Sequence, residues 1–96
     1  MKYVIDIDGT LCSHEYNYSD AKPYIDNIQH INRLYKDGHI IWLFTARGTD
    51  TKIDWTSVTI GQLKKWGVSY HNLLFGKPSA DRYIDDKAIN AAHFPW

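Results

Sequence analysis

The chain has 96 residues, of which 44% are hydrophobic, and its 11 basic residues balance its 11 acidic ones. A chain of this length forms one domain, here residues 1–96, that buries roughly 60–65% of its extended surface. The charge balance argues against nucleic-acid and anionic-membrane partners, and the single cysteine, Cys12, excludes an internal disulfide and fits a reducing cytoplasm.

The first predicted element is a strand over residues 2–7, apolar apart from Asp6, with Asp8-Gly9 directly after it. No long apolar segment precedes it, so neither a signal peptide nor a membrane span is expected. Side chains two residues apart on a strand share a face, which brings Asp6 and Asp8 together. Since burying like charges is costly, this pair indicates a metal or reaction centre, unless Asp8-Gly9 is a solvated turn.

Two helices are predicted, each with a glycine after its last turn. Residues 11–22 form a polar, tyrosine-rich loop or small hairpin, here called the flap, and Pro23 suits the first turn of the first helix. The apolar stripe of this helix is Ile25, Ile28, Ile31 and Leu34 or Tyr35, and Gly38 follows it. The stripe of the second helix is Trp55, Thr59, Leu63 and Trp66, and Gly67 follows it.

Three further strands are predicted over residues 39–44, 73–75 and 83–84. They are followed by Thr45-Ala46-Arg47-Gly48, Gly76-Lys77-Pro78 and Asp85-Asp86, respectively. Alternation of strands and helices predicts parallel strands with right-handed crossovers and helices on both faces of the sheet. Residues 87–92 form at most a short helix before an apolar tail, which either folds back on the sheet edge or serves a dimer interface.

Ligands of such sheets bind at the carboxyl ends of the strands, where these polar groups are expected to converge. Carboxylates suit a hard cation, so Asp6 and Asp85 are expected to bind Mg²⁺. The Thr45 hydroxyl and the Lys77 ammonium suit phosphate oxygens. One carboxylate could then attack phosphorus and a second could transfer protons.

In this arrangement Asp6-Ile7-Asp8-Gly9-Thr10-Leu11 resembles the signature of the haloacid dehalogenase (HAD) superfamily of phosphatases. Thr45, Lys77 and the Asp85-Asp86 pair match its other three motifs in order. The resemblance implies that Asp6 is the nucleophile and a Mg²⁺ ligand, and that Asp8 is the general acid/base and lends Mg²⁺ its backbone carbonyl. It implies that Thr45 and Lys77 bind phosphate, that Asp85 binds Mg²⁺, and that Asp86 binds it through water or orients the site.

The resemblance also implies a three-layer, Rossmann-like domain, but the chain departs from the family pattern in leaving no room for the usual cap and little room for a further strand after the fourth motif. We therefore expect a domain without a cap, with about four strands in the order 4-1-2-3. The expected activity is Mg²⁺-dependent hydrolysis of a phosphomonoester, such as a sugar or polyol phosphate, through an aspartyl-phosphate. A homo-oligomer is left open. The expected substrate-binding residues are Gly9, Thr45, Ala46, Arg47 and Lys77.

Each of these residues also has an ordinary explanation. Thr45 suits a turn, Lys77 an exposed loop, Arg47 a protein surface, and Asp85 or Asp86 a helix cap. A non-catalytic, receiver-like module that binds Mg²⁺ and phosphate is the alternative function, although its acidic pair would precede a phosphorylated aspartate on a middle strand. A scaffold that is active only when assembled is a third.

Overall fold

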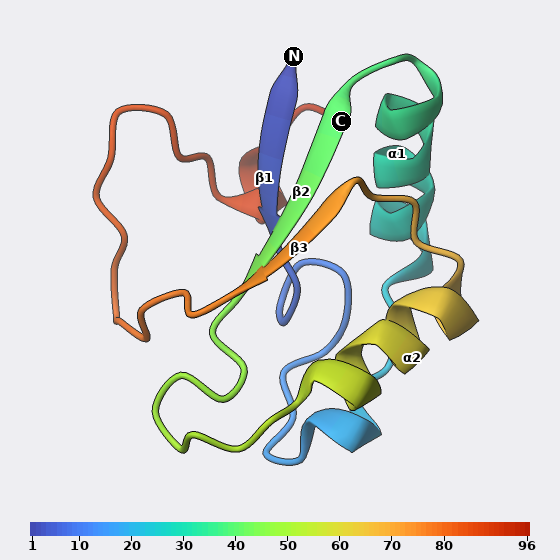
Figure 1. The fold of residues 1–96 in the computed structure, drawn as a ribbon. Helices are drawn as coiled ribbons and strands as arrows, with labels where there is room; N and C mark the ends of the chain where they lie inside the picture. The colour runs from blue at the N-terminus through green and yellow to red at the C-terminus, as the bar shows by residue number, and fades with distance from the viewer.

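The structure, a computed structural model that describes residues 1–96, contains a three-stranded parallel sheet in the order β1-β2-β3 (Figure 1). Helix α1 connects β1 to β2, and α2 connects β2 to β3. The strands are β1 (Lys2–Asp6), β2 (Ile40–Thr45) and β3 (Asn72–Phe75); the helices are α1 (Ile25–Lys36) and α2 (Thr56–Trp66), with short 3₁₀ helices η1 (Tyr18–Asp20) and η2 (Ala91–His93).

The predicted α/β class with parallel strands is confirmed, but the fourth strand and the order 4-1-2-3 are wrong. Residues 83–84 lie in an irregular, exposed segment, and the Ile84 side chain is 96% exposed. Two apolar residues bury too little surface to offset the entropy of ordering this segment. Its neighbours are charged and prefer water: Asp81, Arg82, Asp85, Asp86 and Lys87.

The three-layer arrangement is also wrong, because both helices cover the same face of the sheet (Figure 1). Crossovers of one hand place successive helices on one face when the strands are added in one direction. Buried residues of α1 and α2 accordingly join one core with alternate residues of β1 and β2. That core consists of Ile5, Ile7, Leu11, Cys12, Ile28, Ile31, Ile41, Leu43 and Leu63.

The helix ends follow the expected glycine signals, but the expected starts are wrong: Pro23 precedes α1, which begins at Ile25, and Trp55 precedes α2, which begins at Thr56. The apolar stripes supply the buried residues of both helices, and Gly67 ends α2 in the left-handed conformation, with φ of 69°. Gly38, two residues beyond the end of α1, also has a positive φ, of 95°. Neither helix is long and apolar enough to cross a lipid bilayer.

The C-terminal tail packs back onto α1 and β1. The Trp96 ring stacks on His30 with centroids 5.6 Å apart, and Phe94 meets Tyr3 edge-on at 5.9 Å. Of the two roles that the sequence left open for the tail, the structure therefore shows the first. The short helix expected at residues 87–92 is reduced to the single turn of η2.

Gly48, in the loop after β2, adopts a left-handed backbone conformation that favours glycine, so replacing it should destabilise the protein. Its φ is 78°, and a Cβ atom here would lie 2.3 Å from the backbone oxygen of Ile53. Gly48→Ala should therefore lower the free energy of unfolding by at least about 1–2 kcal/mol in urea titrations. Gly61→Ala, in the open interior of α2, should instead raise it by about 0.5–1 kcal/mol. Equal stability of the Gly48 variant and wild type would contradict this account.

Candidate active site

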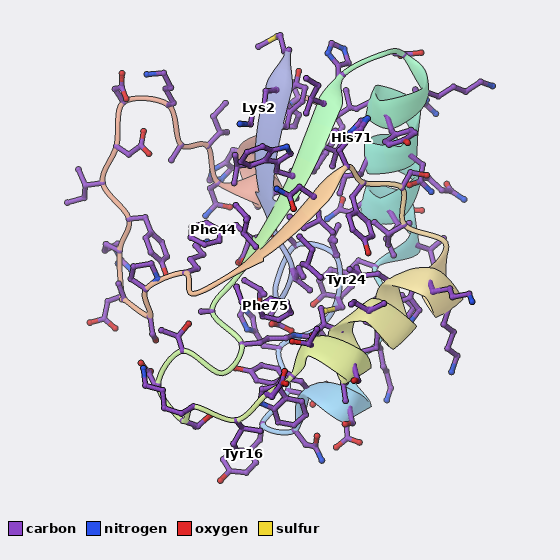
Figure 2. The ribbon with its side chains drawn as sticks, in the orientation of Figure 1. Lys2, Tyr16, Tyr24, Phe44, His71 and Phe75 are labelled. Atoms are coloured by element: carbon purple, nitrogen blue, oxygen red, sulfur yellow. The ribbon has the colours of Figure 1, made fainter.

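The carboxyl ends of the three strands bring Asp6 and Lys77 together. In the sheet register Asp6 is opposite Phe44, and Thr45 is opposite Phe75; the two phenylalanines mark this end of the sheet in Figure 2. After β3 the backbone N–H of Lys77 donates to the Thr45 carbonyl at 3.1 Å, which holds Lys77 beside β2. Its Nζ then lies 3.6 Å from Oδ1 of Asp6. An acid and a base from distant parts of the chain thus form an ion pair at this edge.

Asp6 is a half-buried acid that solvent still reaches. Burial raises the pKa of Asp6 above its ordinary value. The charge of Lys77 and a hydrogen bond from the Ile7 backbone oppose this rise, and the charge of Asp8 adds to it. The Asp6 side chain is 37% exposed, so it is the accessible carboxylate of the pair.

Asp8, the second predicted acid, is held by Arg47 in a bidentate ion pair. Arg47 Nη2 donates to Oδ1 of Asp8 at 2.9 Å, and Nε donates to Oδ2 at 3.0 Å. Burial lowers the pKa of Arg47, but the hydrogen bonds and charge of Asp8 outweigh it and raise that pKa above its usual value. Arg47 was expected to contact substrate from a loop, yet its side chain is fully buried.

The remaining amino group of Arg47 is bound by α2. Nη1 donates to Oγ1 of Thr59 at 3.1 Å and to Oε1 of Gln62 at 2.6 Å. These two partners were missed as site residues in the sequence. The available signal was a threonine within an otherwise apolar helical stripe, with a glutamine three residues later on the same side of the helix.

The flap contacts the cluster formed by Asp8, Arg47, Thr59 and Gln62. Gln62 Nε2 donates to the Tyr18 carbonyl at 2.7 Å, and the Tyr18 ring covers the Arg47 guanidinium at 4.8 Å. Tyr18 also meets Trp55 edge-on, with ring centroids 5.0 Å apart. Tyr16, two residues before Tyr18 in the flap, is fully exposed and points into solvent (Figure 2).

Cys12 is a buried member of the same cluster. Its Sγ donates to Oδ1 of Asp8 at 3.5 Å. Burial, together with the charge of Asp8, raises the pKa of the Cys12 thiol from its ordinary value of 9.0 to about 12. The thiol is therefore a packing group at neutral pH and a poor nucleophile.

This environment predicts that Cys12 resists alkylation in the folded protein. With its pKa near 12, about 1000-fold less thiolate forms near pH 8 than for a cysteine of pKa 9.0, in addition to the steric effect of burial. Iodoacetamide labelling followed by mass spectrometry should be slow in buffer and fast in guanidinium chloride. Equal rates in the two conditions would show that the thiol is not in this environment.

Thr45, Gly9 and Ala46 lie beside the ion pairs. Thr45 is buried, and its hydroxyl accepts the backbone N–H of Arg47 at 3.1 Å, so this oxygen already has a partner. Gly9 makes the turn after β1 with φ of 85°. The carbonyl of Ala46 accepts the N–H of Thr49 at 3.0 Å. Among the predicted phosphate-binding side chains, Lys77 is the one placed against the accessible carboxylate.

The structure does not bring Asp85 and Asp86 to the other acids. Both lie in the exposed segment that loops away from the sheet (Figure 1). Asp85 accepts the backbone N–H of Lys87 at 2.6 Å, which lowers the pKa of Asp85, and Asp86 pairs with Lys87 Nζ at 3.1 Å. Because this segment does not form a strand, the Asp85 and Asp86 carboxylates contact Lys87 instead of Asp6 or Asp8.

Of the predicted Mg²⁺ ligands, the structure places Asp6 and Asp8 at the strand ends and leaves Asp85 and Asp86 in the exposed segment. No group of three or more histidine, cysteine, aspartate or glutamate side chains that could hold a metal occurs. At the strand ends Asp6 contributes an accessible carboxylate. Both side-chain oxygens of Asp8 accept from Arg47, which leaves the backbone carbonyl as the atom of Asp8 predicted to bind Mg²⁺.

Comparisons with known proteins show the fold class of this chain. No protein-family model and no curated protein matches it. A crystal structure of a structural-genomics target from Vibrio cholerae superposes with a TM-score of 0.86 at 29% identity, covering 95% of this chain and 84% of that one. A structure of a Pnkp1/Rnl/Hen1 complex gives 0.63 at 22% identity, covering 88% of this chain but 30% of that one, and shows the fold alone.

Proposed function

We propose that this protein hydrolyses phosphomonoesters, with Asp6 as the nucleophile. The observation that carries this proposal is the pairing of an accessible carboxylate with Lys77 at the carboxyl ends of parallel strands. Ligands of α/β proteins bind at this edge, and a lysine there can offset the charge of a phosphoryl group. The resemblance of residues 6–11, Thr45 and Lys77 to motifs of the HAD superfamily supports the same reaction.

Hydrolysis would proceed in two displacements at phosphorus. Asp8 carries a proton on Oδ2 when the ester binds. An oxygen of the Asp6 carboxylate attacks, the bond from phosphorus to the ester oxygen breaks, and the leaving oxygen takes that proton from Asp8. Asp8 then removes a proton from water, which attacks the aspartyl-phosphate and releases inorganic phosphate and the Asp6 carboxylate. Lys77 stabilises the charge on the phosphoryl oxygens in both steps.

The exposure of Asp6 favours a substrate whose leaving group extends into solvent. More than a third of the Asp6 side chain is open to water. We propose a phosphate ester such as a sugar or polyol phosphate, encountered in the reducing cytoplasm that the free thiol of Cys12 suits. Size-exclusion profiles and activity, measured across a range of protein concentrations, test whether the protein forms a homo-oligomer and whether its activity requires one.

A screen of phosphorylated metabolites tests this function. Phosphate release is followed over many turnovers, in parallel with Mg²⁺ and with EDTA, which also tests the predicted magnesium requirement. Sustained release from at least one phosphomonoester is the expected result. Release of no more than one equivalent would indicate the receiver-like alternative, and no reaction with any ester would overturn the proposal.

A further inference from the structure

We propose that Arg47 is a positioning residue that fixes the orientation of the Asp8 carboxylate without contacting the substrate. This inference rests on the proposed function, in which Asp8 transfers protons. It assigns Arg47 a role different from the phosphate contact that the sequence predicts for it.

The hydrogen-bonding capacity of Arg47 is fully used inside the protein. An arginine side chain has five N–H donors. Nε and one hydrogen of Nη2 go to Asp8, and both hydrogens of Nη1 go to Thr59 and Gln62. The second hydrogen of Nη2 faces Sγ of Cys12 at 3.7 Å. Because all five N–H groups have partners and the side chain is fully buried, the guanidinium cannot donate a hydrogen bond to a phosphate.

The same contacts leave one oxygen of Asp8 available for chemistry. A carboxylate has about four acceptor positions, two on each oxygen. Oδ1 of Asp8 accepts from both Arg47 Nη2 and Cys12, whereas Oδ2 accepts from Arg47 Nε alone. Oδ2 therefore keeps one free acceptor position, and the Asp8 side chain is 14% exposed. Arg47 thus fixes the plane of the carboxylate, and Cys12 takes the second position on Oδ1, so Oδ2 is the oxygen that can meet a leaving group.

Anchoring to α2 makes this orientation rigid. Thr59 and Gln62 hold Nη1, and Gln62 also holds the flap through the Tyr18 carbonyl. The orientation of the guanidinium plane is thereby fixed by α2 directly and by the flap through Gln62, in addition to Asp8 after β1. A proton-transfer group held this way is pre-organised, and a displacement of about 1 Å can cost roughly 100-fold in rate.

Steady-state kinetics of Arg47→Lys test the proposal. Lysine keeps the charge but lacks the planar fork, so it cannot hold both carboxylate oxygens. We expect kcat to fall by about 10- to 100-fold while KM changes less than about threefold, because binding is intact. Arg33→Lys, on the exposed surface of α1, is the matched control and should resemble wild type. A raised KM with kcat preserved would overturn the proposal, as would unchanged kinetics.

Gln62→Met provides a second variant in which Asp8 keeps both bonds from Arg47. It removes one anchor of the guanidinium and should lower kcat by roughly two- to tenfold with KM unchanged. Gln29→Met, an exposed glutamine on α1, is its control. A Gln62 effect confined to KM, or no effect, would show that the anchor does not act through Asp8.

A measurement that needs no substrate separates this inference from the proposed function. The Arg47 Nε–H should give a slowly exchanging NMR signal in wild type, and Asp8→Ala should make its exchange fast. Fast exchange already in wild type would overturn the positioning role itself. If the signal behaves as expected but wild type hydrolyses no phosphomonoester, the proposed function has failed, and the inferred effect of Arg47 on turnover fails with it.

Discussion

Replacing Asp6 with asparagine should lower phosphomonoester turnover by about 10⁴-fold or more while making the protein more stable at neutral pH. The loss of activity follows from the loss of the nucleophile, since an amide oxygen does not form the acyl-phosphate. Phosphate release by Asp6→Asn and wild type, at matched concentrations, measures this effect. Asp81→Asn, a change in the exposed segment, should leave turnover unaltered.

The gain in stability follows from the raised pKa of Asp6. Between the ordinary pKa of 3.8 and the higher value in the folded state, the native protein binds more protons than the unfolded chain. The contribution of Asp6 to the free energy of unfolding therefore falls as the pH rises from 3.8 to the pKa of Asp6 in the folded state. Above that pKa the charged Asp6 carboxylate opposes folding. The raised pKa already includes the opposing attraction of Lys77.

Thermal unfolding at two pH values checks this sign. Asp6→Asn should unfold at a higher temperature than wild type near pH 7 and at a similar temperature near pH 3, where Asp6 is protonated in both states. A variant that is less stable than wild type at neutral pH would show that the charged carboxylate stabilises the fold.

Replacing Lys77 with glutamine should lower kcat by about 10²–10³-fold. The lysine is the cation paired with Asp6, and removing one group that stabilises transition-state charge costs roughly this much. Lys87→Gln, which removes a fully exposed lysine paired with Asp86, is the matched control and should keep wild-type turnover. Equal losses in both variants would indicate a general effect of charge rather than a local one.

The pH dependence of the Lys77 variant gives an independent check. The charge of Lys77 lowers the pKa of Asp6, so its removal should raise that pKa further. Because the nucleophile must be ionised, the acidic limb of the rate profile should move to higher pH in Lys77→Gln. A limb that stays in place would mean that Asp6 does not limit the rate at low pH.

The sequence predicts the central fold of this protein because local signals there agree with one another. Periodic stripes mark both helices, and Gly67 stops α2 where it is expected. The fourth strand fails because a two-residue apolar run carries little information about its tertiary partners. Its loss removes Asp85 and Asp86 from the strand ends, so one incorrect element accounts for the missing half of the predicted metal site.

The role of Arg47 could not be predicted in the same way. A loop arginine next to a candidate phosphate site looks available for substrate, and its burial depends on contacts made by the flap and α2. Those contacts join residues far apart in the chain, so no regular spacing in the sequence reveals them. By contrast, the proximity of Asp6 and Lys77 follows directly from the parallel sheet, because each residue lies at or just beyond the end of its strand.

The most direct test of the proposed chemistry is to trap the phosphorylated protein. Wild type is mixed with a hydrolysed phosphomonoester, quenched in acid within the turnover time, and digested for mass spectrometry. We predict a phosphoryl group on the peptide that carries Asp6, labile to hydroxylamine and missing from the Asp6→Asn variant. A phosphoryl group on another residue, or undiminished turnover by Asp6→Asn, would contradict the assignment of Asp6 as the nucleophile.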